Sequence, residues 1–267
     1  MFTKQLRLLT FNLRTSLAEG DGPNYWKKRK DYVLETILDS KPDFAALQET
    51  SPDMWEDLEP HLGAWQIVKG WAEQGPKATG VGLLIRRPFR LHATGQFWLS
   101  DTPNVEESIT FKHDWGPRIV LWAQIEGNPP YGLFYAMATH FDTNPESWLP
   151  TSKVALEQIN QIAGYSHPTW LMGDFNCPGG CPAWQHLADD YFEDAWLKTG
   201  QGEEGTYTYH KFSGKNETHE GRIDWILYRC NGHHPWKATS CTIDRRNKNG
   251  FYPSDHFPVS ATYELIE

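Results

Sequence analysis

The sequence lacks an excess of basic residues. Its 267 residues include 25 Lys and Arg against 34 Asp and Glu, which gives a formal net charge of -9 at pH 7. A protein that holds long nucleic acid mainly by neutralising phosphates is normally basic, so this chain must meet any polyanion with local positive charge. The charge balance therefore argues against a protein that binds long nucleic acid along a basic surface.

Long apolar runs are also missing. No stretch approaches the roughly 18 consecutive apolar residues of a membrane-spanning helix. Met1 leads almost directly into residues 6–11, which are typical of a strand and not of a secretory signal. We expect a cytoplasmic protein that does not associate with membranes, and no protein partner is predicted.

Cysteine is scarce. The four cysteines, Cys177, Cys181, Cys230 and Cys241, allow two disulfides or one four-thiolate zinc site in principle. Cys177 and Cys181 have the spacing of a loose zinc knuckle, but no second close pair of Cys or His completes it. Free thiols are therefore expected, as in most cytoplasmic proteins.

The remaining composition is that of a globular protein, with 39% hydrophobic and 22% charged residues. Helical spacing of apolar residues predicts helices over about residues 26–38 and 151–164. Residues 66–68, 81–85 and 96–99 are predicted to form an antiparallel meander. Further strand-like runs lie at residues 6–11, 44–47, 118–125, 133–139, 169–172 and 223–228, and a last strand ends near residue 261.

The two halves of the chain share one outline of strand, helix, strand and meander. This pattern predicts an α+β fold, a four-layered α/β/β/α sandwich in which two mostly antiparallel sheets pack face to face with helices outside. No linker divides the sequence, so residues 1–267 are predicted to form a single domain. Sites in such a sandwich lie at one end, where loops from both sheets meet.

Polar side chains follow many of the predicted strands. The clearest case is the apolar run 169–172, which ends in Gly173, Asp174, Phe175 and Asn176. Carboxylate and amide oxygens at a strand end can hold a hard cation, although the same residues also make ordinary turns. The residues at or near predicted strand ends are Asn12, Glu49, His140, Asp174, Asn176, Asp224, Asp255 and His256.

Six short blocks, taken in order, resemble the signature of the endonuclease/exonuclease/phosphatase superfamily, which has the deoxyribonuclease-I-like fold. They are Thr10-Phe11-Asn12, Gln48-Glu49, Thr139-His140-Phe141-Asp142, Gly173-Asp174-Phe175-Asn176, Arg222-Ile223-Asp224 and Ser254-Asp255-His256. Asp21-Gly22-Pro23-Asn24, Phe97-Trp98-Leu99-Ser100 and Trp115-Gly116-Pro117-Arg118 further resemble a bacterial branch that is similar to deadenylase catalytic domains. The resemblance implies metal-dependent cleavage of a phosphate ester.

The resemblance also assigns roles, and the residue types agree with them. Oxygen ligands without a close pair of His or Cys suit Mg²⁺ or Mn²⁺. Glu49 is the first expected metal ligand, with Asn12 and Asp255 helping directly or through water. Asp174 and Asn176 are expected to orient the attacking water, and Asp174 is a candidate to deprotonate it.

The phosphate itself is assigned to basic side chains. His256 is expected to donate to a nonbridging oxygen, with its ring held by Asp224, and this pairing should keep the ring charged near neutral pH. His140 is predicted to be a second phosphate donor or the leaving-group acid, and Arg118 a fork that binds the phosphate. Any one of these residues alone would more often be structural, but their ordered joint occurrence favours function.

Two further features have functional and structural interpretations. Residues 27–30 form a basic cluster, which is more often a solvated helix face than a phosphate site. Trp26, Trp71, Trp115 and Trp148 could form an aromatic rim that stacks on a base or sugar. With 13 tryptophans in the chain, core packing is the default for each.

Three functional hypotheses follow from the sequence. The leading one is a Mg²⁺- or Mn²⁺-dependent phosphoesterase that uses in-line attack of water on a small or terminal phosphodiester or phosphomonoester. The alternative is a nuclease that acts on single-stranded or damaged nucleic acid. A catalytically silent binding module is a third hypothesis, which the full set of acids and histidines argues against.

Overall fold

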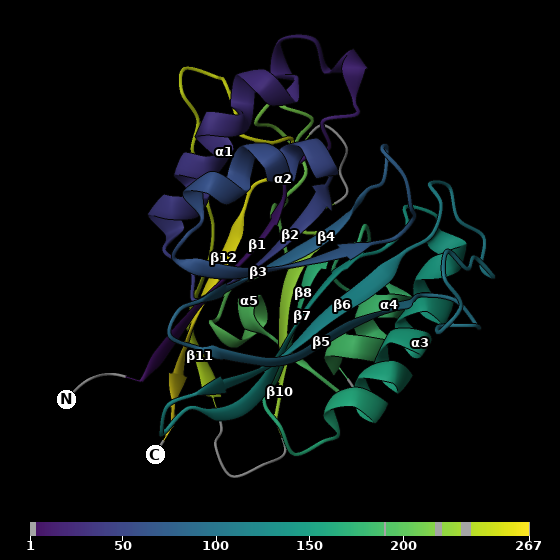
Figure 1. The fold of residues 1–267 in the computed structure, drawn as a ribbon, viewed down its shortest axis with the longest axis vertical. Coiled ribbons are helices and arrows are strands. Elements are labelled where there is room, and N and C mark those ends of the chain that lie inside the picture. The colour runs from purple at the N-terminus through teal and green to yellow at the C-terminus, as the bar shows by residue number, and fades with distance from the viewer. Residues whose placement is uncertain (1–3, 190, 217–220, 231–235, 267) are drawn as a thin grey trace.

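A computed structural model of the chain describes residues 4–189, 191–216, 221–230 and 236–266. Two six-stranded sheets pack face to face, and helices cover their outer faces (Figure 1). Only the β1–β2 and β7–β8 pairs are parallel within the two sheets, while the other strand pairs are antiparallel. The α+β sandwich of mostly antiparallel sheets predicted from the sequence is therefore confirmed.

The first sheet contains strands from both ends of the chain. Its order is β11 (Trp236–Ile243), β12 (Val259–Leu265), β1 (Gln5–Asn12), β2 (Phe44–Thr50), β4 (Gly80–Arg86) and β3 (Trp65–Trp71). The second sheet has the order β5 (Arg90–Trp98), β6 (Ile119–Gly127), β7 (Gly132–His140), β8 (Thr169–Asp174), β10 (Asp224–Arg229) and β9 (Glu193–Asp194).

Each layer boundary is an apolar cluster. Side chains such as Leu83 and Met172 from the inner faces of both sheets form the central cluster. The outer face of the first sheet packs against α1 (Trp26–Ser40) and α2 (Pro52–Leu58), and that of the second against α3 (Pro145–Ala163) and α4 (Pro182–Trp184). Strands buried on both faces read as continuous apolar runs, which explains why residues 44–47 and 81–85 are recognisable in the sequence.

The remaining helical elements are short. They are η1 (Glu19–Asn24), η2 (Glu59–His61), η3 (Gln185–Asp189) and α5 (Ala195–Lys198). Within the described ranges, no helix combines the length and apolar character needed to cross a membrane.

The meander predicted over residues 66–99 is wrong in its last strand. Residues 66–68 and 81–85 belong to β3 and β4 of the first sheet, but 96–99 overlap β5, which pairs with β6 in the second sheet. The turn at Arg87 and Pro88 carries the chain from one sheet to the other. Local strand patterns do not encode the sheet that a strand joins, because that choice depends on long-range packing.

The second predicted helix begins earlier than expected. We predicted its start near residue 151, but α3 begins at Pro145, with Pro150 inside it. The side chain of Asn144 caps it by accepting a hydrogen bond from the backbone N–H of Glu146, and proline is well suited to the first helical position. The first turns of α3 therefore lie close to Asp142, beside the site described below.

Candidate active site

The predicted site residues lie at one edge of the sandwich. Asn12 ends β1 and Glu49 lies near the end of β2, and these strands are parallel neighbours in the first sheet. His140 ends β7 and Asp174 ends β8, which are parallel and pair at these two residues. Because parallel strands end at the same edge of a sheet, all four side chains are delivered to one side of the molecule.

A cavity of about 850 Å³ opens at this edge. Asn12 and Asp224 are fully buried behind it and hydrogen-bond to residues of its wall. The structure thus brings all nine predicted residues together from widely separated parts of the sequence. The other seven line the cavity: Glu49, Arg118, His140, Asp174, Asn176, Asp255 and His256.

Asn12 joins the two sheets at the base of the cavity. Its amide nitrogen donates to Glu49 Oε1 at 3.0 Å in the first sheet and to Asp174 Oδ2 at 2.9 Å in the second. Its amide oxygen accepts from the backbone nitrogen of Arg14 at 2.9 Å. In this orientation the side chain holds both carboxylates in place and has its oxygen engaged within the protein.

The turn after β8 places Asp174 and Asn176. A Cβ atom at Gly173 would lie 2.2 Å from the carbonyl oxygen of Thr139, so only glycine lets β8 approach β7 this closely. Asn176 has a φ of 49°, a left-handed conformation that asparagine tolerates, and its backbone nitrogen donates to Asp174 Oδ1 at 2.9 Å. Its amide nitrogen donates to the carbonyl oxygen of Phe141 at 2.9 Å.

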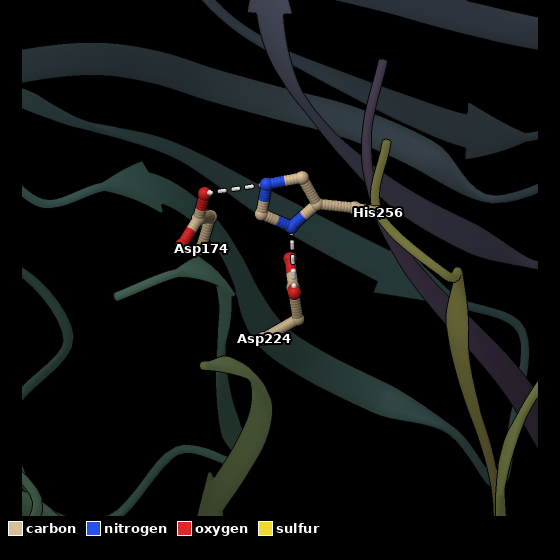
Figure 2. A group of neighbouring side chains, drawn as sticks. All are labelled: Asp174, Asp224 and His256. Atoms are coloured by element: carbon tan, nitrogen blue, oxygen red, sulfur yellow. Dashed lines mark hydrogen bonds and ion pairs between the residues drawn. The ribbon is translucent and has the colours of Figure 1, made fainter. Parts of the chain in front are cut away.

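Asp174, Asp224 and His256 form one group in which two carboxylates face the two nitrogens of an imidazole (Figure 2). His256 Nδ1 lies 3.0 Å from Asp224 Oδ2, and Nε2 lies 3.7 Å from Asp174 Oδ2. Asp224 and Asp174 are direct partners in the β10–β8 register. Their pairing brings both carboxylates to the same ring.

The charges of this group set its protonation. Burial alone would lower the pKa of His256, but the charges of Asp224 and Asp174 outweigh it and raise the pKa to about 10. Burial and the charge of Asp224 raise the pKa of Asp174 to about 7. At neutral pH, His256 is therefore a cation that can donate to an anion, while Asp174 has the proton affinity suited to a general base.

Glu49 and Asp255 form a second acidic pair in the cavity wall. Glu49 has a φ of 56° at a register shift between β2 and β4, and such irregularities re-aim side chains at functional sites. Burial opposes ionisation of Glu49, but the backbone N–H of Thr15, the charge of Arg14 and the amide of Asn12 favour the ionised form and hold its pKa below the ordinary value. Burial raises the pKa of Asp255, and the charge of Glu49 raises it further. The two carboxylates therefore repel each other.

A divalent cation fits Glu49 and Asp255 better than the group around His256. Ligand atoms of Asp174, Asp224 and His256 lie within 4.8 Å of one another. However, both nitrogens of His256 face carboxylates, and a protonated ring has no lone pair to give a metal. Glu49 and Asp255 offer hard oxygen atoms, whose repulsion a cation would relieve, and this donor type suits Mg²⁺ or Mn²⁺.

His140 and Arg118 supply N–H groups to the same cavity. Arg118 Nη1 donates to His140 Nδ1 at 3.2 Å, and the amide nitrogen of Asn176 lies 3.0 Å from His140 Nε2, so each ring nitrogen has a donor group beside it. Burial and the charge of Arg118 lower the pKa of His140, which keeps the ring neutral. His140 Nε2 lies 3.5 Å from Asp174 Oδ2. The two side chains thus add a neutral imidazole and a guanidinium beside the carboxylates.

Arg29 is a supporting residue that the sequence placed in the basic cluster of residues 27–30. Its side chain is fully buried and donates to the backbone carbonyls of residues 13–14, to that of Asn24 at 2.7 Å, and to that of Pro253 at 3.1 Å. These bonds tie the segment after β1 to the segment before Asp255. The guanidinium therefore stabilises the segment that follows Asn12 and the segment that leads into Asp255.

The spacing of residues along α1 predicts the burial of Arg29. Arg29 follows Trp26 by three residues and precedes Val33 by four, so it lies on the apolar face of α1. Lys27 and Lys28 are exposed, as expected for a solvated face. None of the cluster lines the cavity.

Only two of the four tryptophans considered for an aromatic rim line the cavity, Trp115 and Trp148. Trp26 is buried between α1 and the first sheet, and its indole nitrogen donates to Asp57 Oδ2 at 2.8 Å. Trp71 lies in β3 and packs against the same cluster.

Comparisons with known proteins agree with this geometry. The two packed sheets and the cavity at the strand ends define a deoxyribonuclease-I-like sandwich. The model of the Endonuclease/Exonuclease/phosphatase family matches residues 9–256, and the chain belongs to this family. A search of curated proteins found no match.

Solved structures show the same fold. An endonuclease/exonuclease/phosphatase from Bacteroides vulgatus is 25% identical, with a TM-score of 0.87 over 98% of this chain and 100% of that one. A mannosyl-6-phosphatase from Bacteroides thetaiotaomicron is 21% identical, with a TM-score of 0.83 over 98% and 100%. The human Nocturnin catalytic domain with a bound sulfate anion is 20% identical, with a TM-score of 0.77 over 98% and 94%. The predicted likeness to the superfamily and to its deadenylase-like members is confirmed.

Proposed function

We propose that this protein is a Mg²⁺- or Mn²⁺-dependent phosphoesterase that hydrolyses a small or terminal phosphate ester by in-line attack of water. The observation that carries the proposal is the convergence of two opposite electrostatic environments on one cavity. The cation His256 lies between Asp174 and Asp224, while the acidic pair Glu49 and Asp255 lines the same cavity. A cation and N–H donors together hold an anionic phosphate ester and stabilise the charge that develops when it is cleaved.

Asp174 is the proposed general base. Its pKa of about 7 gives it the proton affinity to accept a proton from water near neutral pH. The backbone N–H of Asn176 and the amide of Asn12 each fix one of its oxygens. The carboxylate is therefore oriented before a substrate arrives, and Asn176, which also lines the cavity, helps to position the water.

His256, His140 and Arg118 are the proposed phosphate-binding residues. Asp224 keeps His256 protonated, so its ring donates to a nonbridging oxygen and stabilises the negative charge that develops there. Arg118 supplies a guanidinium for a second oxygen. His140 is proposed to donate a hydrogen bond from its neutral ring to the phosphate.

Glu49 and Asp255 are the proposed metal ligands, and Asn12 orients Glu49 for this role. When bound, a Mg²⁺ or Mn²⁺ ion withdraws electron density from the phosphoryl oxygens and lowers the barrier to attack. The mutual repulsion of the two carboxylates supports a cation at this position.

A compact substrate is supported by the net charge of -9 and by a cavity of about 850 Å³, a size typical of sites for small molecules. The apolar cluster shared by both sheets supports one catalytic domain over residues 1–267. The alternative nuclease would need an extended basic groove beside the cavity. A salt titration separates the two, because affinity for a nucleic acid strand falls steeply with salt.

The test is a panel of phosphate esters assayed with Mg²⁺, with Mn²⁺ and with excess chelator. Sugar phosphates, nucleotides, inositol phosphates and single-stranded oligonucleotides represent the candidate classes. The proposal predicts hydrolysis of at least one small ester that chelator abolishes and added metal restores. Hydrolysis that persists in chelator would contradict the role of the metal.

A further inference from the structure

Trp115 presents an aromatic ring at the wall of the cavity that the proposed chemistry does not use. The residue is 73% exposed, the highest value among the exposed large hydrophobic residues that the structure describes. It lines the cavity together with Trp148, Arg118 and His140. The ring therefore faces the same cavity as the residues assigned to the phosphate.

The backbone beneath this ring is firmly held. Residues 113–118, here called the tryptophan loop, are anchored by the buried carboxylate of Asp142, which accepts from the backbone nitrogens of Asp114 at 2.7 Å and Trp115 at 3.1 Å. His113 Nδ1 lies 2.8 Å from the carbonyl oxygen of Gly116, which closes the loop on itself. Because the backbone is already held, a ligand that covers the ring has only the side-chain torsions of Trp115 to order.

The tryptophan loop is also anchored to the segment that precedes α3. Asp114 accepts from the amide of Asn144 at 3.0 Å and from the hydroxyl of Thr143 at 3.1 Å. The loop thus gains contacts to both residues that lead into α3. This anchoring makes a fixed platform for the Trp115 ring, although the ring itself packs little within the protein.

The same Asp142 connects the aromatic residues to the phosphate-binding arginine. Its Oδ2 accepts from Arg118 Nε at 3.4 Å and Nη2 at 3.3 Å as well as from the backbone of Trp115. Its carbonyl oxygen accepts from the indole nitrogen of Trp148 at 3.0 Å. One buried residue therefore sets the spacing between a guanidinium and two tryptophans.

We propose that Trp115, supported by Trp148, binds the flat face of a ring in the group esterified to the phosphate that Arg118 holds. A tryptophan face offers stacking to a nucleobase and C–H contacts to a sugar, and both ligands share an apolar ring face close to a phosphate. This inference rests on the proposed phosphoesterase activity. It names the substrate class as ring-bearing phosphate esters, either sugar phosphates or nucleotides.

The test compares KM for three esters, a hexose phosphate, a nucleoside monophosphate and the ring-free glycerol phosphate, in the Mg²⁺-loaded protein. Trp115→Ala should raise KM for at least one ring-bearing ester by about 5- to 150-fold, the equivalent of one stacked ring, with little change for glycerol phosphate. Trp115→Phe, which keeps an aromatic face, should restore most of the loss. Ile109→Ala is the matched control, because Ile109 is 46% exposed and does not line the cavity.

The outcomes separate the aromatic subsite from the phosphoesterase activity on which it rests. A larger loss with the nucleoside phosphate assigns the ring to a base, and a larger loss with the hexose phosphate assigns it to a sugar. Equal KM changes for ring-bearing and ring-free esters would overturn the aromatic subsite and leave the phosphoesterase intact. Failure of the wild-type protein to hydrolyse any ester with Mg²⁺ or Mn²⁺ would overturn the proposed function and the subsite with it.

Discussion

The charge on His256 is the most quantitative feature of the site, and Asp224→Asn tests it. The substitution keeps the shape of the side chain but removes one negative charge 3.0 Å from His256 Nδ1. At an effective dielectric constant of about 20, two unit charges at that distance attract by about 5 kcal/mol. Since 1.36 kcal/mol corresponds to about one pH unit, the titration of His256 should move down by about four pH units.

The direct assay is NMR titration of the histidine ring signals in metal-free protein, with the His256 signals assigned from a His256→Asn variant. Wild-type His256 should remain protonated through neutral pH and lose its proton near its pKa of about 10. In Asp224→Asn the ring should already be largely neutral at pH 8. Asp244→Asn is the control, because the Asp244 carboxylate pairs with Arg246 and lies outside the group of Asp174, Asp224 and His256.

The pH dependence of the rate should change together with the protonation of His256. If protonated His256 stabilises the phosphate, the alkaline limb of the pH–rate profile should shift down in Asp224→Asn along with the NMR titration. The reasoning would be refuted by an unchanged His256 titration in the variant. An unchanged alkaline limb, despite a shifted titration, would refute the role of His256 as a cationic donor.

The remaining predictions concern the metal, a buried cation and a buried histidine. Glu49→Gln should weaken Mn²⁺ binding, measured by calorimetry, by about 10- to 100-fold or more, because it removes a charged ligand; equal affinity would exclude Glu49 as a ligand. Arg29→Ala should lower the free energy of unfolding in urea by about 3–5 kcal/mol, because it leaves several buried carbonyls unpaired, whereas exposed Lys27→Ala should have no effect. Burial and the charge of His256 lower the pKa of His210 to about 3, below the usual value of about 6.5 in an unfolded chain. The unfolded state therefore binds this proton first, so stability should fall below pH 6.5 by up to about 1.4 kcal/mol per pH unit, and His210→Asn should reduce that slope. Identical slopes in the two proteins would contradict the effect.

Much of the fold follows from apolar runs in the sequence. Strands buried on both faces, such as β2 and β8, stand out because sheets on one side and helices on the other exclude polar residues from them. Strand β11 was missed, because it alternates Trp236, Ala238 and Cys241 with polar residues and has no continuous apolar run. The sheet that β5 joins was also unpredictable, since it is decided by packing between distant segments.

The site residues could be predicted from the sequence because they follow strands in recognisable blocks. Asp174 and His140, for example, end neighbouring parallel strands, and that topology alone puts them side by side. The contacts that hold these site residues in place could not be predicted in the same way. Asp142 belongs to one of these blocks, but its links to Arg118 and Trp115 join segments 24 and 27 residues apart, which no local pattern encodes.

The central claim is that side chains from both sheets converge to hydrolyse a phosphate ester with a divalent cation. The most direct measurement is the Mg²⁺-dependent initial rate of hydrolysis by the wild-type protein and by Asp174→Asn, with the best ester from the panel. We predict that the variant folds normally and loses about 10²- to 10⁴-fold in kcat, because it has no general base. A variant that turns over at the wild-type rate would contradict the account.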